Sequence, residues 1–213
     1  PKLGPTRFAL LRKFPSMAET WGASQRELEA AGIEPGVAAA LVEHRAATNV
    51  EESWREITQL GLCVLTIADP RYPRLLAETS DPPALLYVRG NADLLSERSI
   101  AVVGTRRATS YGLRAAHEVT SALVRAGLVV VSGLAYGIDA CAHRACIEAG
   151  GRTVAVMAAG LDEVYPTANH SLAERIVESG GACVSEFPPK VPPLKQHFPF
   201  RNRIIAGLTP GTE

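Results

Sequence analysis

Four short apolar runs without polar alternation recur along the second half of the chain. Runs of this kind, rich in β-branched residues, are typical of parallel strands buried on both faces of a sheet. Between them apolar residues recur every three or four positions, as in the helix expected from about Ser110. The pattern predicts a Rossmann-like α/β fold, a mostly parallel sheet with helices on both faces, with strands at 99–103, 128–131, 153–157 and 182–186 and intervening helices from residues 110, 138 and 170.

Two further segments precede this part of the chain. Residues 1–57 show helical spacing broken at Pro15, Gly32 and Pro35-Gly36, and residues 31–42 resemble the turn of SAM-like or helix-hairpin-helix modules. We therefore expect a small all-helical accessory domain at 1–57, whose balanced charge argues against a DNA-binding surface of its own. Residues 58–98 hold two apolar runs punctuated by proline, which predict a strand and turn extension of the sheet.

The first two strands of the 99–186 pattern each end in a loop of small residues. Parallel strands open on the same sheet edge, and both loops lead into helix N-termini, whose free N–H groups and positive dipole end favour an anion. Small side chains let the backbone approach a ligand closely, while Arg106 and Arg107 add permanent positive charge. The loops predict a site for successive phosphates, with candidate residues Gly104, Thr105, Arg106, Ser132, Gly133, Ala135 and Gly137.

A long basic stretch with interleaved aromatic residues follows the fourth strand. The proline-rich segment 187–193 leads into Lys195 and then into a loop expected to run to Arg203 before another helix begins. Positive charge suits the phosphates of a single nucleic-acid strand, and exposed rings suit its unstacked bases. Phe198 could equally be an ordinary core ring. The candidate contacts in this stretch are Lys195, Phe198, Arg201, Asn202 and Arg203.

The distribution of charge matters more than its total. The 213 residues have a formal net charge of zero, yet residues 98–152 carry +4 and residues 187–213 carry +3. A neutral protein with two basic segments at one sheet edge can still present a local positive groove. No apolar run is long enough to span a membrane and no secretory signal pattern is present, so we expect a cytoplasmic protein. The four cysteines show no disulfide framework and are interpreted as buried apolar residues.

Several catalytic interpretations find little support in the sequence. A dinucleotide-dependent dehydrogenase needs Gly-x-Gly-x-x-Gly after the first strand, and a P-loop NTPase needs Gly-x-x-x-x-Gly-Lys; neither occurs. Ser132, Asp139 and His143 lie near one another, but without the Gly-x-Ser-x-Gly elbow, and Asp139 is interpreted as favouring the helix dipole. Cys141, His143 and Cys146 lack the spacing of a metal site. We expect no cofactor, no metal and no catalytic residue.

A set of ordered motifs resembles one known family. The strings are Val-Gly-Thr-Arg at 103–106, Ser-Gly-Leu-Ala-Tyr-Gly-Ile-Asp-Ala at 132–140, Tyr-Pro at 165–166 with Asn169, Ser-Glu at 185–186 and Phe-Pro-Phe-Arg-Asn-Arg-Ile-Ile-Ala-Gly-Leu at 198–208. Together they resemble the DNA-processing protein A (DprA/Smf) family over most of residues 69–208. Residues 99–213 would then be a Rossmann-like DNA-binding domain, incomplete at its C-terminal end because the family's sheet continues past the last motif.

The resemblance implies a non-catalytic protein that binds single-stranded DNA, protects incoming strands during natural transformation and loads the RecA recombinase as a homodimer. The alternative from another class is a nucleotide phosphoribohydrolase that binds a nucleoside monophosphate. Its Pro-Gly-Gly-x-Gly-Thr-x-x-Glu signature is only faintly echoed by residues 210–213 (Pro-Gly-Thr-Glu), with different spacing.

Overall fold

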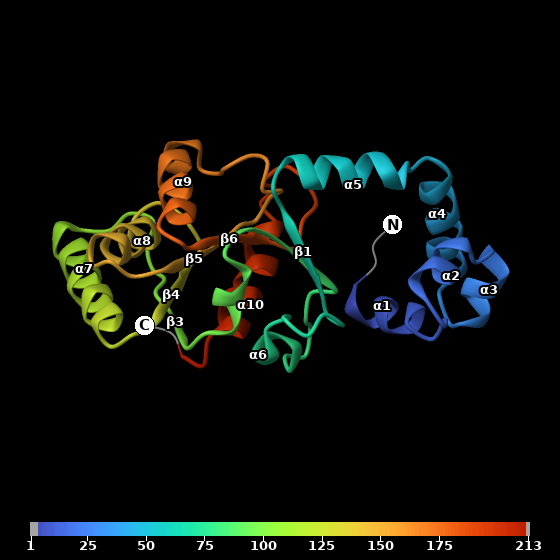
Figure 1. Cartoon of the computed structure of the whole chain (residues 1–213), viewed down its shortest axis with the longest axis horizontal. Helices are drawn as coiled ribbons and strands as arrows, with labels where there is room; N and C mark the ends of the chain where they lie inside the picture. Colours follow the sequence, from blue (N-terminus) through green and yellow to red (C-terminus); the bar gives the residue numbers. More distant parts are fainter. Residues whose placement is uncertain (1–3, 212–213) are drawn as a thin grey trace. The chain divides into compact units, whose positions relative to one another are not determined.

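The computed structural model describes residues 4–211, which form two compact units that divide after Gln59 (Figure 1). Each unit is described by itself. Among these residues, no helix combines the length and apolarity that a membrane crossing requires.

The first unit consists of short helices around a small apolar core. A capping box fixes the start of one of them: the Ser24 hydroxyl accepts the amide of Glu27, and the Glu27 carboxylate accepts the amide of Ser24. The core residues are Leu11, Ala23, Leu28, Ile33 and Ala38. The helices are α1 (Pro5–Leu11), α2 (Met17–Gly22), α3 (Gln25–Ala30), α4 (Pro35–Ala46) and α5 (Val50–Gln59). Its SAM-like character stays a prediction.

The second unit is built on a six-stranded sheet in the order β1-β2-β6-β5-β4-β3. The four strands of the Rossmann-like pattern run parallel, and the two preceding strands extend the sheet in antiparallel fashion. The predicted mostly parallel α/β fold is therefore confirmed. The strands are β1 (Cys63–Thr66), β2 (Leu85–Gly90), β3 (Ser99–Ala101), β4 (Val129–Ser132), β5 (Thr153–Val156) and β6 (Ala182–Ser185).

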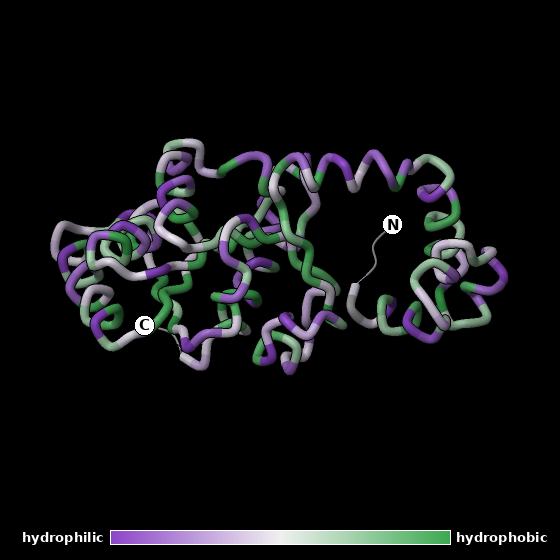
Figure 2. Tube along the Cα trace, in the orientation of Figure 1, coloured by the Kyte–Doolittle hydropathy of each residue, from purple (hydrophilic) through white to green (hydrophobic). Residues whose placement is uncertain are grey.

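Helices cover both faces of this sheet because its strands alternate apolar side chains between two cores. Val130 packs with residues of the crossover helices on one face, whereas its neighbours Val129 and Val131 pack with Ile204 and Leu208 on the other. The strands are accordingly mostly green in the hydropathy colouring of Figure 2. The crossover helices are α7 (Ser110–Arg125), α8 (Ile138–Glu148) and α9 (His170–Glu178). On the opposite face, α10 (His197–Leu208) and α6 (Arg74–Ala77) contact each other. The 3₁₀ turns are η1 (Ala92–Ser96) and η2 (Thr167–Asn169).

One element differs from the sequence prediction. The basic stretch expected to remain a loop as far as Arg203 becomes helical at His197. Pro199 did not prevent this, because it lies in the first helical turn, where its missing N–H would have no intrahelical partner. Phe198, Arg201 and Arg203 consequently project from one rigid helix, α10, and only Lys195 lies in the preceding segment.

Candidate nucleic-acid interface

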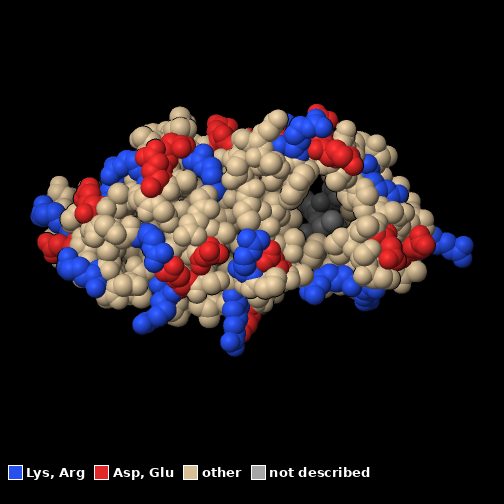
Figure 3. Space-filling model, viewed as in Figure 1, with Lys and Arg blue, Asp and Glu red and all other residues tan. Residues whose placement is uncertain are grey.

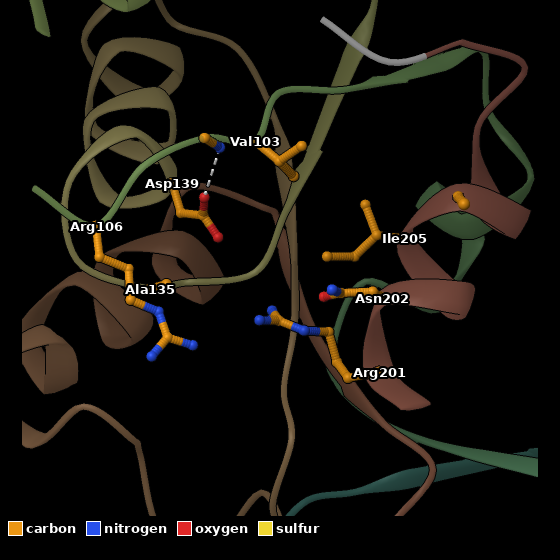
Figure 4. Close-up of a pocket in the computed structure, with 9 residues that line it drawn as sticks. Val103, Arg106, Ala135, Asp139, Arg201, Asn202 and Ile205 are labelled. Atoms are coloured by element: carbon orange, nitrogen blue, oxygen red, sulfur yellow. Dashed lines mark hydrogen bonds between the residues drawn. The ribbon is translucent and has the colours of Figure 1, made fainter. Parts of the chain in front are cut away.

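A pocket of about 380 Å³ opens where β3 and β4 end (Figure 4). The loop after β3, the loop after β4 and one side of α10 form its walls, so it brings together the two loops and the basic stretch singled out from the sequence. The residues around it are Val103, Gly104, Arg106, Ala135, Asp139, Arg201, Asn202, Ile205 and Ala206.

A buried carboxylate joins the two loops at this pocket. Asp139, in the first turn of α8, accepts the amide of Gly133 at 3.1 Å with one oxygen. Its other oxygen accepts the amide of Gly104 at 3.3 Å, the bond drawn as a dashed line in Figure 4. The sequence predicts only a dipole role for Asp139 and a phosphate-binding role for the amides of these loops. In the structure both amides already have an anionic partner, so the charge available to a ligand comes from side chains.

Two glycines in the loop after β4 are required by close contacts within the protein. Gly137 has φ +77°, and a Cβ there would lie 2.2 Å from the Thr105 carbonyl oxygen. A Cβ on Gly133 would lie 1.8 Å from the Arg201 guanidinium. These glycines were predicted to admit a ligand, but the space they leave is filled by the protein itself, which locks the loops and α10 together.

Arg201 is a buried residue of the pocket wall. It is 4% exposed, and its Nη1 donates to the Val156 carbonyl at 2.6 Å at the end of β5. Burial lowers the pKa of its guanidinium, and the negative charge of Asp139 partly opposes that shift. Figure 4 shows Arg201 extending from α10 into the pocket, on the side that Arg106 also faces. A guanidinium fixed in this way shapes the pocket and contributes positive charge to it.

The exposed part of the site pairs an arginine with aromatic rings. The Arg106 guanidinium carbon lies 5.1 Å from the centre of the Phe198 ring, and the Tyr165 ring meets Phe198 edge-on with a centroid distance of 5.8 Å. Arg106 and Tyr165 are exposed, Phe198 is half-buried, and the exposed Lys195 precedes the helix that carries Phe198. Phe198 is therefore neither a fully buried core ring nor free of contacts.

Arg203 makes contacts that the sequence did not indicate. Its Nε lies 3.1 Å from an Asp81 carboxylate oxygen, Nη1 donates to the Asp81 carbonyl at 2.6 Å, and Nη2 pairs with Glu186. Burial raises the pKa of the Glu186 carboxyl, and Arg203 opposes that shift. Because two carboxylates balance its charge, Arg203 fastens α10 to the residues before β2 and after β6, and this occupies the guanidinium that was assigned to DNA.

The remaining predicted site residues have varied positions. Asn202 lies on the pocket wall with Ala135. The Thr105 hydroxyl accepts the amide of Arg107 at 3.1 Å and so shapes its own turn. Ser132 is fully buried at the end of β4, and its hydroxyl has no hydrogen-bond partner among the described residues.

The other candidate chemistry is not assembled by the fold. His143 is fully buried, and its Nδ1 lies 2.8 Å from the Thr153 hydroxyl, while its Nε2 and the Ser132 hydroxyl have no hydrogen-bond partner among the described residues. Burial raises the pKa of the Cys146 thiol to about 12. Across the described part of the chain, no cluster of three or more His, Cys, Asp or Glu side chains is arranged to hold a metal ion.

A residue that sequence reasoning left without a role is Asn169. It is 4% exposed, and its side-chain amide donates to the Leu134 carbonyl at 2.9 Å. Leu134 has φ +56°, an unusual value for a residue with a side chain, in the loop that also contains Gly133 and Gly137. Asn169 thus holds this loop from the segment that contains Tyr165. In the sequence, the one indication of this role is the family motif that contains Tyr165, Pro166 and Asn169.

Charge elsewhere on the molecule does not form a broad positive surface on the face seen in Figure 3. Lys and Arg side chains are interspersed there with Asp and Glu. This agrees with the zero net charge.

The chain has close relatives of known family. A family model described as DNA recombination-mediator protein A matches residues 63–212. The chain is 44% identical over 152 residues to DNA processing protein DprA of Bacillus subtilis (strain 168), covering 71% of this chain and 51% of that protein. It is 47% identical over 146 residues to DNA processing protein DprA of Streptococcus pneumoniae, covering 68% and 51%. The chain thus spans about half the length of the curated relatives it matches.

Solved structures give the same result. The X-ray structure of DNA processing protein A from Streptococcus pneumoniae matches with a TM-score of 0.82 and 35% identity, covering 97% of this chain and 71% of that one. A structure described as showing the single-stranded DNA binding mode of DNA processing protein A from Helicobacter pylori matches with a TM-score of 0.64 and 31% identity, covering 71% and 67%. The motifs, the sheet they occupy and the family match together show that this chain belongs to the DprA/Smf family of DNA recombination-mediator protein A.

Proposed function

We propose that this chain binds single-stranded DNA at the pocket edge formed by Arg106, Lys195 and Phe198. In the cell it protects incoming single strands during natural transformation and loads the RecA recombinase onto them, acting as a homodimer without a catalytic step of its own. The names of its relatives refer to DNA processing, and one structural relative is described by its single-stranded DNA binding mode.

The observation that carries the proposal is the placement of Arg106 over the Phe198 ring at 5.1 Å. A single strand presents a phosphate and an unstacked base at nearly every step, so it is best met by a cation and an aromatic face side by side. Arg106 is exposed at the mouth of the pocket, and Lys195 adds a second exposed cation before α10. A duplex keeps its bases stacked and would use only the cations.

The predicted site residues divide into contacts and supports under this proposal. Arg106, Lys195, Phe198 and Asn202 meet the strand. Arg203 is left out, because Asp81 and Glu186 already occupy it. The supports, which shape the two loops and hold α10 against them, are Gly104, Thr105, Ser132, Gly133, Ala135, Gly137 and Arg201.

Charge and stacking are separated by two substitutions. Arg106→Ala is expected to weaken binding to thymine oligomers and to reduce the slope of log affinity against log salt by about 0.7, the value for one phosphate on a single strand. Phe198→Ala is expected to cost about 1–3 kcal/mol of affinity with the slope unchanged, because the ring carries no charge. Fluorescence anisotropy across a salt series measures both quantities.

The matched controls are Arg125→Ala and Phe200→Ala. Arg125 ends α7 and so lies at the opposite edge of the sheet, and Phe200 is an exposed ring two positions further along α10, on a different side of the helix. Neither is expected to change affinity. If Phe198→Ala lowers the melting temperature but binds as tightly as the original chain, Phe198 is only a packing residue and the base-contact role is wrong.

The phosphoribohydrolase alternative has no support from the described residues. Both Asp139 oxygens at the pocket accept backbone amides, and the glutamate of its faint motif, Glu213, lies outside the described residues. Incubation with nucleoside monophosphates tests it directly, since release of free base would identify the enzyme.

A further inference from the structure

Two large aromatic side chains at the pocket's edge of the sheet have no part in the contacts described so far. Tyr111 is 75% exposed in the first turn of α7, and Tyr136 is 50% exposed in the loop before α8. One exposed ring needs no explanation. Two exposed rings at the starts of neighbouring helices, on the edge where β3 and β4 end, do need an explanation.

The backbone connects both tyrosines to the Arg106 turn. The amide of Ile138 donates to the Thr105 carbonyl at 3.2 Å, and the intervening Gly137 packs against Thr105 and Arg106 so closely that no Cβ fits. Tyr136 directly precedes this contact. The Ile138 side chain also approaches Gly112, which directly follows Tyr111. Tyr136 therefore lies next to a residue that contacts the Arg106 turn, and Tyr111 lies next to a residue near Ile138, which is bonded to that turn.

Positive charge accompanies these rings. Arg107 and Arg114 are exposed on the same loop and the first turns of α7, and no carboxylate is paired with either among residues 4–211. The N-terminus of α7, which has no acidic residue in its first turn, adds the positive end of a helix dipole. Exposed rings and cations at one helix-terminal edge match what a single strand presents, a base face and a phosphate at each step.

We propose that Tyr111 and Tyr136 form a second base-stacking subsite, which carries a single strand from the Arg106–Phe198 pocket across the start of α8 to the start of α7. This proposal rests on the proposed function, because it extends the same strand. It predicts that the chain occupies more nucleotides than the pocket alone can hold.

The test compares thymine oligomers of about 5 and about 15 nucleotides, which bracket small and extended single-strand sites. With the long oligomer, Tyr111→Ala and Tyr136→Ala are each expected to weaken binding about 5-fold to 150-fold, the loss of one stacked base. With the short oligomer, which the pocket can hold alone, both variants should bind like the original chain. Tyr111→Phe and Tyr136→Phe keep the ring and should restore the long-oligomer affinity.

Val119→Ala is the matched control, since Val119 is an exposed apolar residue two turns further along α7. Alanine suits a helix, so Tyr111→Ala should leave α7 folded. If the alanine variants bind both oligomers normally while Phe198→Ala does not, the second subsite is refuted and the proposed function stands. If they bind DNA normally but change the molecular mass in solution, the tyrosines belong to a protein interface instead. If the original chain binds neither oligomer, both proposals fail.

Discussion

Replacing Asp139 with alanine is expected to lower the free energy of unfolding by about 2–4 kcal/mol and to weaken DNA binding at the same time. The carboxylate accepts the amides of Gly133 and Gly104, and its negative charge opposes the lowering of the Arg201 pKa by burial. Removing it leaves a buried N–H without a partner and releases the loop that positions Arg106. Urea unfolding and oligomer anisotropy on the same variant measure the two effects.

The isosteric variant Asp139→Asn makes this prediction sharper. An asparagine can accept one of the two amides, but its NH₂ group would face the other as a second donor, so we expect a smaller loss of stability than with alanine. Glu148→Gln, an exposed change at the far end of α8, is the control and should alter stability by less than about 0.5 kcal/mol. If Asp139 only repelled phosphate, both variants would bind DNA more tightly, which would contradict the role given to it here.

The chain is expected to lose about 3 kcal/mol of stability between about pH 7 and pH 4 through His143 alone. The Thr153 hydroxyl donates to the Val130 carbonyl, so it accepts from Nδ1 of His143. The neutral ring therefore carries its proton on Nδ1, and Nε2 is unprotonated. Nε2 is buried without a partner among the described residues. Burial therefore lowers the pKa of His143 to about 3.

The direction follows from where the proton binds first. As the pH falls through about 6.5, the unfolded chain takes up this proton while the folded chain does not, so stability is complete above that pH and is lost progressively towards about pH 3. His143→Asn keeps a donor for Thr153 and cannot titrate, so its unfolding free energy should vary less with pH, by about 3 kcal/mol at pH 4. The exposed His170→Asn serves as control. Equal pH dependence of the His143→Asn variant and the original chain would show that His143 is charged in the folded state.

The sheet and its helices could be predicted because their signals are local. β4 and β5 are apolar runs buried on both faces, and Thr109 caps α7 just before the residue at which the helix was expected. The α10 start was missed because the prolines of the basic stretch indicated a loop, although a proline in a first turn is compatible with a helix.

The site could be predicted only in outline. Five of the predicted residues line the pocket, because parallel strands place their ends on one edge: Gly104, Arg106, Ala135, Arg201 and Asn202. It could not find the partners of Asp139 and Arg203, since Gly104 lies 35 residues from Asp139 and Asp81 lies 122 residues from Arg203. Such pairings depend on tertiary packing, and they decide which charges remain available to a ligand.

Selectivity for single strands is measured by comparing a thymine oligomer with a blunt duplex of equal length in fluorescence anisotropy at one salt concentration. If Phe198 and its neighbours meet unstacked bases, the single strand should bind at least about tenfold more tightly, which corresponds to one stacked base. Little dependence on base sequence is expected, because every base offers a face to the ring. Equal affinity for the two DNAs, or tighter binding of the duplex, would show that this chain does not bind single strands through unstacked bases.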